Sequence, residues 1–276
     1  MNFLKKCRRL LVYAGHWIVD GALDFIKCPK PLAFFNPMNT IPMIDSIHLV
    51  GHAGGAIEEN IYTNSREAVE ESIKTGRNVV ELDFVKLDDN YVCFHDEDSI
   101  GFDLPESITA FCERKIKSKY TSLTLDDILD LMESYPSLII IITDCKDGDI
   151  CDFLETICAK LRIMGKVDWS RRFIIQVYSI SQAKELDKNY SFFTKGLTLY
   201  ASTYYVWDFP WLTKMCIMYH IPILIMPYNY VINNYVLKCL KSKNIKIWVH
   251  TVNDKLVAQQ LKIKGVDGIY TDILCR

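Results

Sequence analysis

The chain has 276 residues, of which 50% are hydrophobic and 24% are charged, the balance of a folded globular protein. Its formal net charge of -2 provides no electrostatic footprint for a polyanion, so we expect no nucleic-acid partner. The 10 cysteines are scattered and form no Cys-x-x-Cys pair, which indicates free thiols in a reducing, cytoplasmic setting.

Residues 1–27 are basic at first and then apolar, with Gly15, His16 and Asp20 interrupting the apolar stretch. The segment is too short and too polar for a membrane span, and it lacks the features of a signal peptide. We therefore expect residues 1–45 to form a helical extension packed on the main domain. Peripheral membrane contact through residues 1–27 is the alternative.

From residue 47 onward, short β-branched runs alternate with longer segments of helical period, a pattern typical of βαβ units. We expect Asn64–Glu67 to open the first helix of this region, Thr124 to be the N-cap of another, and Asn253-Asp254 to open the last. The pattern predicts eight strands, the number that closes a barrel. They are Ile47–Gly51, Asn78–Phe84, Leu138–Asp144, Phe173–Val177, Gly196–Tyr200, Ile221–Met226, Ile245–His250 and Asp267–Tyr270.

The predicted fold class is α/β, a TIM (β/α)₈ barrel formed by residues 46–276. The longest insertion, Tyr91–Thr121, follows the second strand. We expect it to be a loop over the end of the barrel where such proteins keep their sites.

Acidic residues gather where the second and third predicted strands end. Glu81 and Asp83 stand two apart and therefore share one face of a strand, and Asp144 and Lys146 repeat this spacing. Burying like charges together is costly without a cation. Three carboxylates form an all-oxygen ligand set, so we predict that Glu81, Asp83 and Asp144 bind Mg²⁺ or Ca²⁺, with Mn²⁺ as a further option. Lys146 would offset the remaining negative charge of a phosphate.

His52 and His95 follow strands beside this acidic cluster. Their unperturbed pKa near neutrality suits an acid–base pair, in which one imidazole deprotonates the attacking group and the other protonates the leaving oxygen. Asp96 either orients a neighbouring group or caps a turn. We expect His250 to be packed in the fold and Asp272 to hold a turn or a neighbouring loop.

The stretch from His52 to Asp96 resembles the N-terminal signature of the glycerophosphodiester phosphodiesterases. That signature runs His-Arg-Gly, Pro-Glu-Asn-Thr, Glu-x-Asp and His-Asp, and here the chain reads HAGG, YTNSREAV, GRNVVELDF and YVCFHD. The later segments IKIWVHTVN and GVDGIYTD resemble the last two strands of the family. The resemblance covers about residues 47–273 and implies a phosphoric diester hydrolase.

Matched position by position, the resemblance implies that His52 and His95 are the acid–base histidines. The two carboxylates of the ELD stretch match the paired metal ligands of the family. Asp144 stands where the family usually has the glutamate of Glu-x-Lys, so it would be the third ligand. Lys146 matches the lysine of that motif, with a catalytic role.

The resemblance further implies that Asn64, Gln176 and Trp248 bind substrate. Two departures weaken the match, because Ala53 replaces the arginine after the first histidine and Thr63 replaces the glutamate of Pro-Glu-Asn-Thr. Losing a phosphate-facing arginine weakens phosphate binding unless another cation substitutes.

Arg66 and Lys86 are the candidates for that substitution. The HAGG and YTNS form resembles a variant branch of the family, which we associate with bacterial surface-polysaccharide loci. The implied substrate is therefore a small-molecule, glycan-linked or lipid-linked phosphodiester. The sequence does not indicate an oligomeric state.

Two alternatives remain open. The first is a phospholipase-type enzyme that acts on a lipid headgroup, favoured by the basic N-terminus and by Tyr204, Tyr205 and Trp207. The second is a catalytically inactive phosphate-binding barrel that lost its activity together with the arginine and the glutamate. A barrel alone would not decide between them, since this fold hosts many functions.

Overall fold

A computed structural model describes residues 49–275 apart from 139, 147–148 and 201–203. The predicted helical extension of residues 1–45, and the membrane contact through residues 1–27, lie outside the described residues. In the described part of the chain, no helix is long and apolar enough to cross a membrane.

Eight parallel strands form a closed barrel, as predicted. The ring closes because the first strand pairs with both the second and the last, Val50 lying opposite Val79 on one side and Tyr270 on the other. Each predicted strand is present: Phe173–Val177 has the predicted ends, and the ends of the others differ by a few residues. The strands are β1 (Leu49–Gly51), β2 (Val79–Leu87), β6 (Ile140–Cys145), β7 (Phe173–Val177), β8 (Thr194–Thr198), β9 (Ile223–Pro227), β10 (Lys246–His250) and β11 (Gly268–Thr271).

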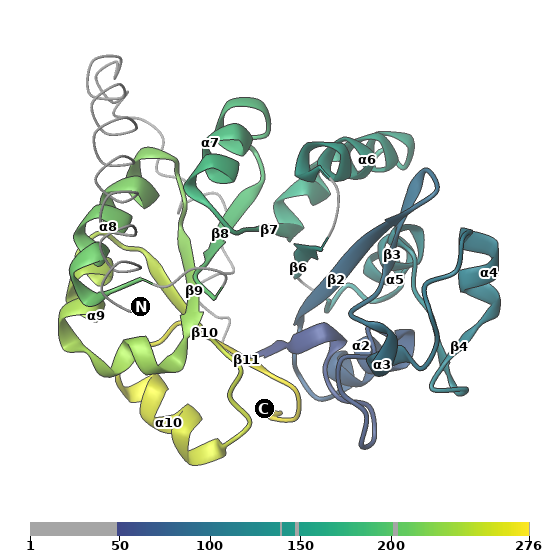
Figure 1. Ribbon diagram of the computed structural model, residues 1–276, viewed down its shortest axis with the longest axis horizontal. Coiled ribbons are helices and arrows are strands. Elements are labelled where there is room, and N and C mark those ends of the chain that lie inside the picture. Colours follow the sequence, from purple (N-terminus) through teal and green to yellow (C-terminus); the bar gives the residue numbers. More distant parts are fainter. Residues whose placement is uncertain (1–48, 139, 147–148, 201–203, 276) are drawn as a thin grey trace, which may run out of the picture. The chain divides into compact units, whose positions relative to one another are not determined.

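Helices lie outside the ring of strands (Figure 1). The expected helix starts are confirmed, since the side chains of Ser65, Thr124 and Asp254 each accept a hydrogen bond from a backbone N–H in the first turn. The helices around the barrel are α2 (Arg66–Lys74), α5 (Leu125–Ser134), α6 (Ile150–Ile163), α7 (Ile180–Asn189), α8 (Phe209–Met218), α9 (Asn234–Lys241) and α10 (Lys255–Ile263). Short 3₁₀ helices are η3 (His52–Gly54), η4 (Val167–Arg172), η5 (Val206–Asp208) and η6 (Tyr228–Ile232).

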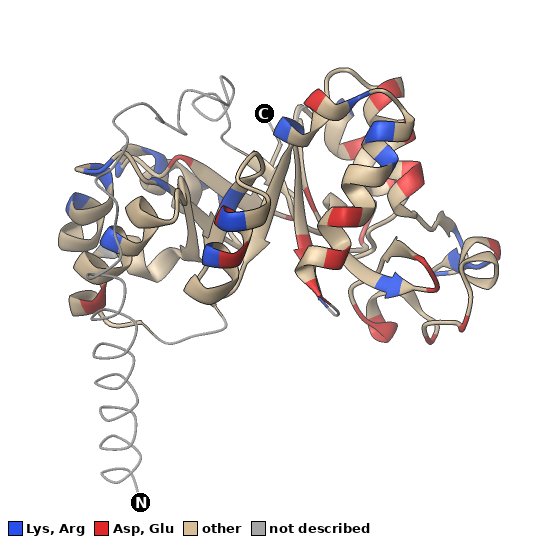
Figure 2. Ribbon diagram, turned by 90° about the horizontal axis from the view of Figure 1, so that it is seen from above, with Lys and Arg blue, Asp and Glu red and all other residues tan. Residues whose placement is uncertain are grey.

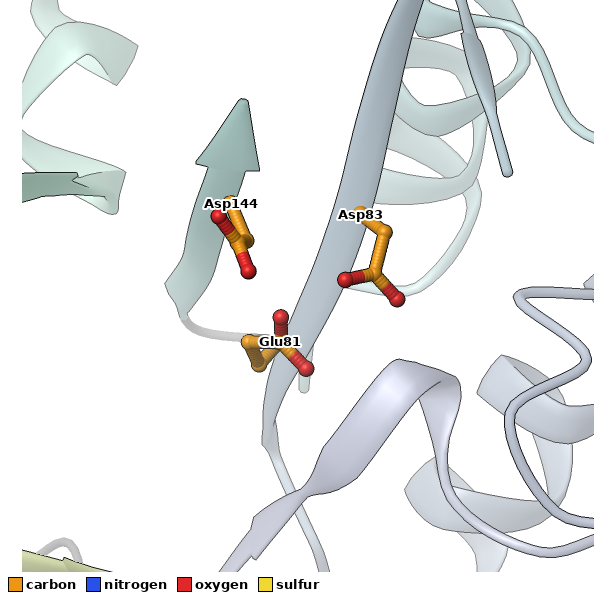
Figure 3. A group of neighbouring side chains, drawn as sticks. All are labelled: Glu81, Asp83 and Asp144. Atoms are coloured by element: carbon orange, nitrogen blue, oxygen red, sulfur yellow. The ribbon is translucent and has the colours of Figure 1, made fainter. Parts of the chain in front are cut away.

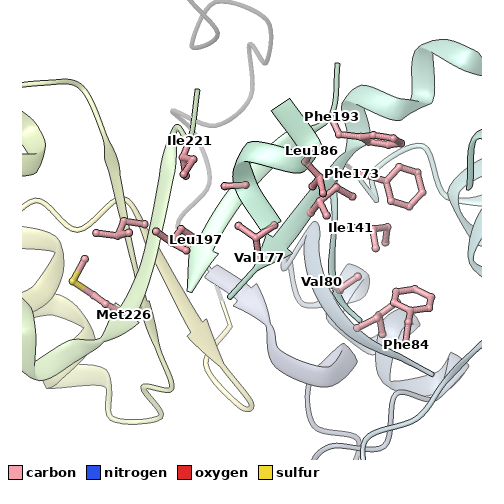
Figure 4. Close-up of a cluster of buried hydrophobic side chains, with 14 of the residues drawn as sticks. Val80, Phe84, Ile141, Phe173, Val177, Leu186, Phe193, Leu197, Ile221 and Met226 are labelled. Carbon is pink, nitrogen blue, oxygen red and sulfur yellow. The ribbon is translucent and has the colours of Figure 1, made fainter. Parts of the chain in front are cut away.

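Side chains alternate between two cores along every barrel strand, as the period of two requires. Outward-facing residues such as Val80, Ile141 and Leu197 pack beneath the helices (Figure 4). Inward-facing residues fill the barrel and make it a packed core rather than a pore. This inner core consists of Val50, Val79, Ile140, Ile142, Ile174, Ile223, Ile225, Trp248 and Tyr270.

The expectation of a loop over residues 91–121 is wrong, because this segment is folded. Its first residues form β3 (Asn90–Cys93), which pairs antiparallel with the extended second half of β2. The remainder forms α3 (Glu97–Ile100), α4 (Ile108–Glu113) and a hairpin of β4 (Lys115–Ile116) and β5 (Tyr120–Thr121), grouped beside β2 in Figure 1. Apolar side chains of the segment pack with Val85 and Leu87 of β2 in a separate core. That core consists of Val85, Leu87, Val92, Phe94, Ile100, Phe111, Ile116 and Tyr120.

Charged side chains of both signs are interspersed along the helices (Figure 2), in keeping with a formal net charge of -2. The acidic residues that matter for the site lie elsewhere, at the carboxyl ends of the strands inside the ring.

Candidate active site

Three carboxylates converge at the carboxyl ends of β2 and β6. Glu81 and Asp83 lie on the inward face of β2, and Asp83 stands directly opposite Asp144 of β6 in the strand register. All three side chains are buried, and each offers a carboxylate oxygen within 4.8 Å of the others. Figure 3 shows them pointing toward one another from the two strands. The predicted ligand cluster therefore exists as a geometric unit.

Lys146 lies between two of these carboxylates. Its ammonium is 2.7 Å from Oδ1 of Asp83 and 2.7 Å from Oδ2 of Asp144. Burial alone would lower the pKa of Lys146, but the charges of these two carboxylates raise it, so the side chain stays protonated. Lys146 is thus placed to neutralise negative charge at the site.

One ammonium does not balance three buried carboxylates. Burial, followed by the charge of Asp83, raises the pKa of Glu81 to about 8. Burial likewise raises the pKa of Asp144 despite the neighbouring ammonium of Lys146. A divalent cation would remove this repulsion, and an all-oxygen donor set suits a hard ion such as Mg²⁺ or Ca²⁺. The residues therefore fit the ion that the sequence predicts.

Backbone and amide hydrogen bonds hold the carboxylates in place. The Asn64 amide donates to Oδ2 of Asp83 at 2.8 Å and accepts from the Asp83 backbone N–H at 3.0 Å. The N–H of Ala53 donates to Oε2 of Glu81 at 2.8 Å. Asn64 is completely buried, so in this structure it orients a carboxylate. Its predicted contact with substrate remains a prediction.

His52 is held by a residue whose role the sequence analysis missed. Its Nδ1 lies 3.0 Å from Oδ1 of Asp272, whose second oxygen accepts a hydrogen bond of 2.6 Å from the Asn253 amide. Asp272 therefore holds the neighbouring loop at Asn253, as expected, and it also binds His52, which the sequence did not indicate. Burial would lower the pKa of His52, but the hydrogen bond to Asp272 and the charge of Glu81 raise it. With Nδ1 engaged, Nε2 is the nitrogen left for chemistry.

His95 follows β3 and reaches the same end of the barrel. The backbone N–H of Phe94 donates to the carbonyl of Asp83 at 3.0 Å, which joins this segment to β2. Nδ1 of His95 is hydrogen-bonded to Oδ2 of Asp96, and Oδ1 of Asp96 caps α3 by accepting from the Ser99 N–H at 2.7 Å. Both expected roles of Asp96 are thus fulfilled at once.

The remaining predicted substrate residues lie at different depths. Gln176 is buried beside Tyr178, whose hydroxyl donates to Asp144. Trp248 has no exposed surface and belongs to the inner core, where its ring fills the space beside Gly268. The structure therefore does not bring Trp248 to the site.

His250, two residues further along the same strand, lies near the mouth of the barrel and contacts the rings of Tyr200 and Tyr270. Burial, followed by the charge of His52, lowers the pKa of His250 to about 4, so this imidazole is neutral. The period of two could have pointed to it, since it shares the inward face with Trp248.

Neither candidate for the missing arginine is free to replace it. Arg66 pairs with Asp127 at 3.2 Å, and Lys86 pairs with Asp152 at 2.8 Å, in both cases through partly exposed side chains. Among the described residues, Lys146 is the cation that contacts the carboxylate cluster.

The fold and this site together define a (β/α)₈ barrel with an acidic centre at the carboxyl end of its strands. No family model matches the sequence, and no curated protein matches it. Solved structures do match.

A glycerophosphodiester phosphodiesterase from Thermotoga maritima is 21% identical with a TM-score of 0.63, covering 82% of this chain and 94% of that one. A putative one from Galdieria sulphuraria is 14% identical with a TM-score of 0.66, covering 82% and 94%. A phosphodiesterase from Oleispira antarctica, in complex with its product sn-glycerol-3-phosphate, is 16% identical with a TM-score of 0.62, covering 82% and 92%. The resemblance predicted from the motifs is confirmed at the level of the fold.

Proposed function

We propose that this chain is a metal-dependent phosphodiester hydrolase of the glycerophosphodiester phosphodiesterase type. The observation that carries the proposal is the convergence of three buried carboxylates with two histidines, each of which has a carboxylate on Nδ1. Glu81, Asp83 and Asp144 would hold Mg²⁺, Ca²⁺ or Mn²⁺. When bound, such an ion polarises phosphorus and neutralises the non-bridging oxygens of the diester.

The proton transfers fall to the histidines. Asp272 favours the His52 tautomer with the proton on Nδ1 and stabilises the imidazolium, which suits His52 to accept a proton through Nε2. The donor would be a water molecule or a hydroxyl neighbouring the phosphate. His95 would then protonate the leaving alkoxide. Lys146 remains protonated and adds positive charge beside the phosphate.

The site and a similar solved structure support a substrate class. The Oleispira antarctica protein is described with the small product sn-glycerol-3-phosphate, which supports a small phosphodiester here. A glycan-linked or lipid-linked diester is the proposed natural form.

Trp207 is 72% exposed and stacks on Tyr205 with centroids 4.7 Å apart, which favours a substrate with an apolar portion. Binding to lipid vesicles, lost on Trp207→Ala, would support the lipid-linked form. Vesicle binding that is unchanged by this variant would count against it.

The test of the proposed function is hydrolysis of bis(p-nitrophenyl) phosphate and of glycerophosphodiesters with Mg²⁺, Ca²⁺, Mn²⁺ or EDTA. Turnover should require the metal and be lost in His52→Ala and Glu81→Ala. His220→Ala is the matched control, because this half-exposed histidine pairs with Asp187 outside the site. If calorimetry detects no metal binding and no diester is cleaved, the inactive phosphate-binding barrel is the better description.

A further inference from the structure

The ring of Tyr62 lies against the imidazoles of both proposed catalytic histidines. Its centroid is 5.0 Å from that of His52, in an edge-on arrangement at 81°. It is 4.9 Å from that of His95, on which it stacks at 18°. Both separations fall in the range of about 4.5–7 Å in which aromatic rings attract one another. One side chain thus contacts both groups.

The backbone around Tyr62 is fixed by hydrogen bonds from neighbouring residues. Its φ of 59° and the φ of 49° at Asn64 lie in the left-handed region, which non-glycine residues adopt mainly where their surroundings impose it. The two hydrogen bonds between Asn64 and Asp83 fix this segment, as does a hydrogen bond of 3.1 Å from the Asn64 N–H to the carbonyl of Ala53. These hydrogen bonds indicate that Tyr62 is a fixed part of the site and does not belong to a mobile loop.

The segment before Tyr62 is also anchored. The N–H of Ala56 donates to the carbonyl of Asp272 at 2.8 Å, at the end of β11. On the other side, the Tyr120 hydroxyl donates to Glu58 at 2.9 Å and accepts from the Asn60 amide at 3.2 Å. The segment therefore joins the barrel to the folded insertion that carries His95.

We propose that Tyr62 is a positioning residue that orients both imidazoles for phosphodiester cleavage, an inference that rests on the function proposed above. Each imidazole is held at two places: at Nδ1 by a carboxylate, from Asp272 or Asp96, and on its ring by Tyr62. These contacts leave Nε2 of both His52 and His95 for the substrate. The signature Pro-Glu-Asn-Thr has proline at the position that Tyr62 takes in the YTNS form of this chain.

The ring of Tyr62, rather than its hydroxyl, makes these contacts. Within the described part of the chain, the hydroxyl forms no hydrogen bond. Burial, followed by the charges of Asp272 and Asp83, raises the pKa of Tyr62, so its side chain stays neutral. A phenylalanine should therefore serve as well, whereas an aliphatic side chain should not.

The test compares Tyr62→Phe and Tyr62→Leu with the wild type in metal-dependent diester hydrolysis. Because Tyr62→Leu removes two ring contacts, we expect it to lower kcat about tenfold and to change KM less than about twofold. Tyr62→Phe should keep kcat within about twofold of the wild type. Tyr235→Leu is the matched control, a half-exposed tyrosine on α9 at the outside of the barrel.

NMR of protein with ¹³C-labelled histidine provides a readout that does not depend on activity. The ring current of Tyr62 should displace the carbon-bound proton signals of His52 and His95. Tyr62→Leu should move these two sets of signals and leave those of the other histidines in place.

The inference is overturned if these signals do not respond to Tyr62→Leu, or if kcat is unchanged in that variant. A rise in kcat/KM would also overturn it, because the ring would then obstruct the substrate. A wild type inactive on every diester would instead contradict the proposed function, while the NMR signals would still test the contacts.

Discussion

Replacing Glu81 by glutamine should stabilise the metal-free protein. Glu81 is buried beside two other carboxylates, and its pKa is raised from 4.5 to about 8. At pH 7 Glu81 is therefore protonated in the folded protein, whereas it is ionised in the unfolded chain. Glutamine has the shape of the protonated side chain and can still accept the hydrogen bond from the N–H of Ala53.

The magnitude follows from linkage. Because the pKa of Glu81 is higher in the folded state, this group does not reduce the free energy of unfolding below about pH 4.5. The free energy of unfolding falls as the pH rises from there toward 8. Each pKa unit corresponds to about 1.4 kcal/mol, so at pH 7 the wild type carries a penalty of about 3 kcal/mol that Glu81→Gln lacks. At pH 5 the difference should be below about 1 kcal/mol. For a domain of this size, the larger difference corresponds to a rise in Tm of about 6–12 °C.

Thermal unfolding in EDTA at pH 5, 7 and 8.5 measures this difference, with Glu59→Gln, at an exposed glutamate, as the control. Addition of Mg²⁺ or Ca²⁺ should then raise the Tm of the wild type and have little effect on Glu81→Gln, which lacks one ligand. The reasoning is refuted if Glu81→Gln is less stable than the wild type in EDTA at pH 8.5. An equal response of both proteins to metal would refute the ligand assignment.

Two further predictions concern the neighbours of the cluster. Asp272→Asn removes a charge that raises the pKa of His52, so the acidic limb of the pH profile of kcat/KM should move to lower pH. The value of kcat should fall about tenfold to a hundredfold. An acidic limb that stays in place would contradict the assignment of His52 as the base. Lys146→Met leaves two buried carboxylates without their ammonium and should lower the free energy of unfolding in EDTA by about 3–5 kcal/mol. Urea denaturation measures this loss, which Mg²⁺ should partly restore; an unchanged midpoint would show that the ion pairs contribute little.

The strands and the acidic cluster were predictable because they depend on local periodicity. Glu81 and Asp83 stand two apart on one strand, and that spacing alone places both on one face. Because carboxyl ends of parallel strands meet at one edge, Asp144 joins them wherever the strands pair in order. The helix starts at Ser65 and Thr124 were likewise predictable, because a capping side chain bonds to a backbone N–H only three residues further along the chain.

The insertion and the barrel interior were harder to predict. The segment 91–121 is rich in polar residues, yet its spaced apolar side chains form a core that only the pairing of β3 with β2 creates. Trp248 and His250 share an inward face. Their depth depends on where β10 ends relative to its neighbours, which a motif does not reveal.

The sequence by itself determined the eight strands, the direction in which the carboxylates point and the histidines that follow the strand ends. Only the tertiary structure decided which residues orient those histidines. Asp272 is 220 residues from His52 along the chain, and closure of the ring between β1 and β11 makes them neighbours. Tyr62 meets His95 because the folded insertion returns to β2. Long-range closure and packing create such contacts, so no local pattern encodes them.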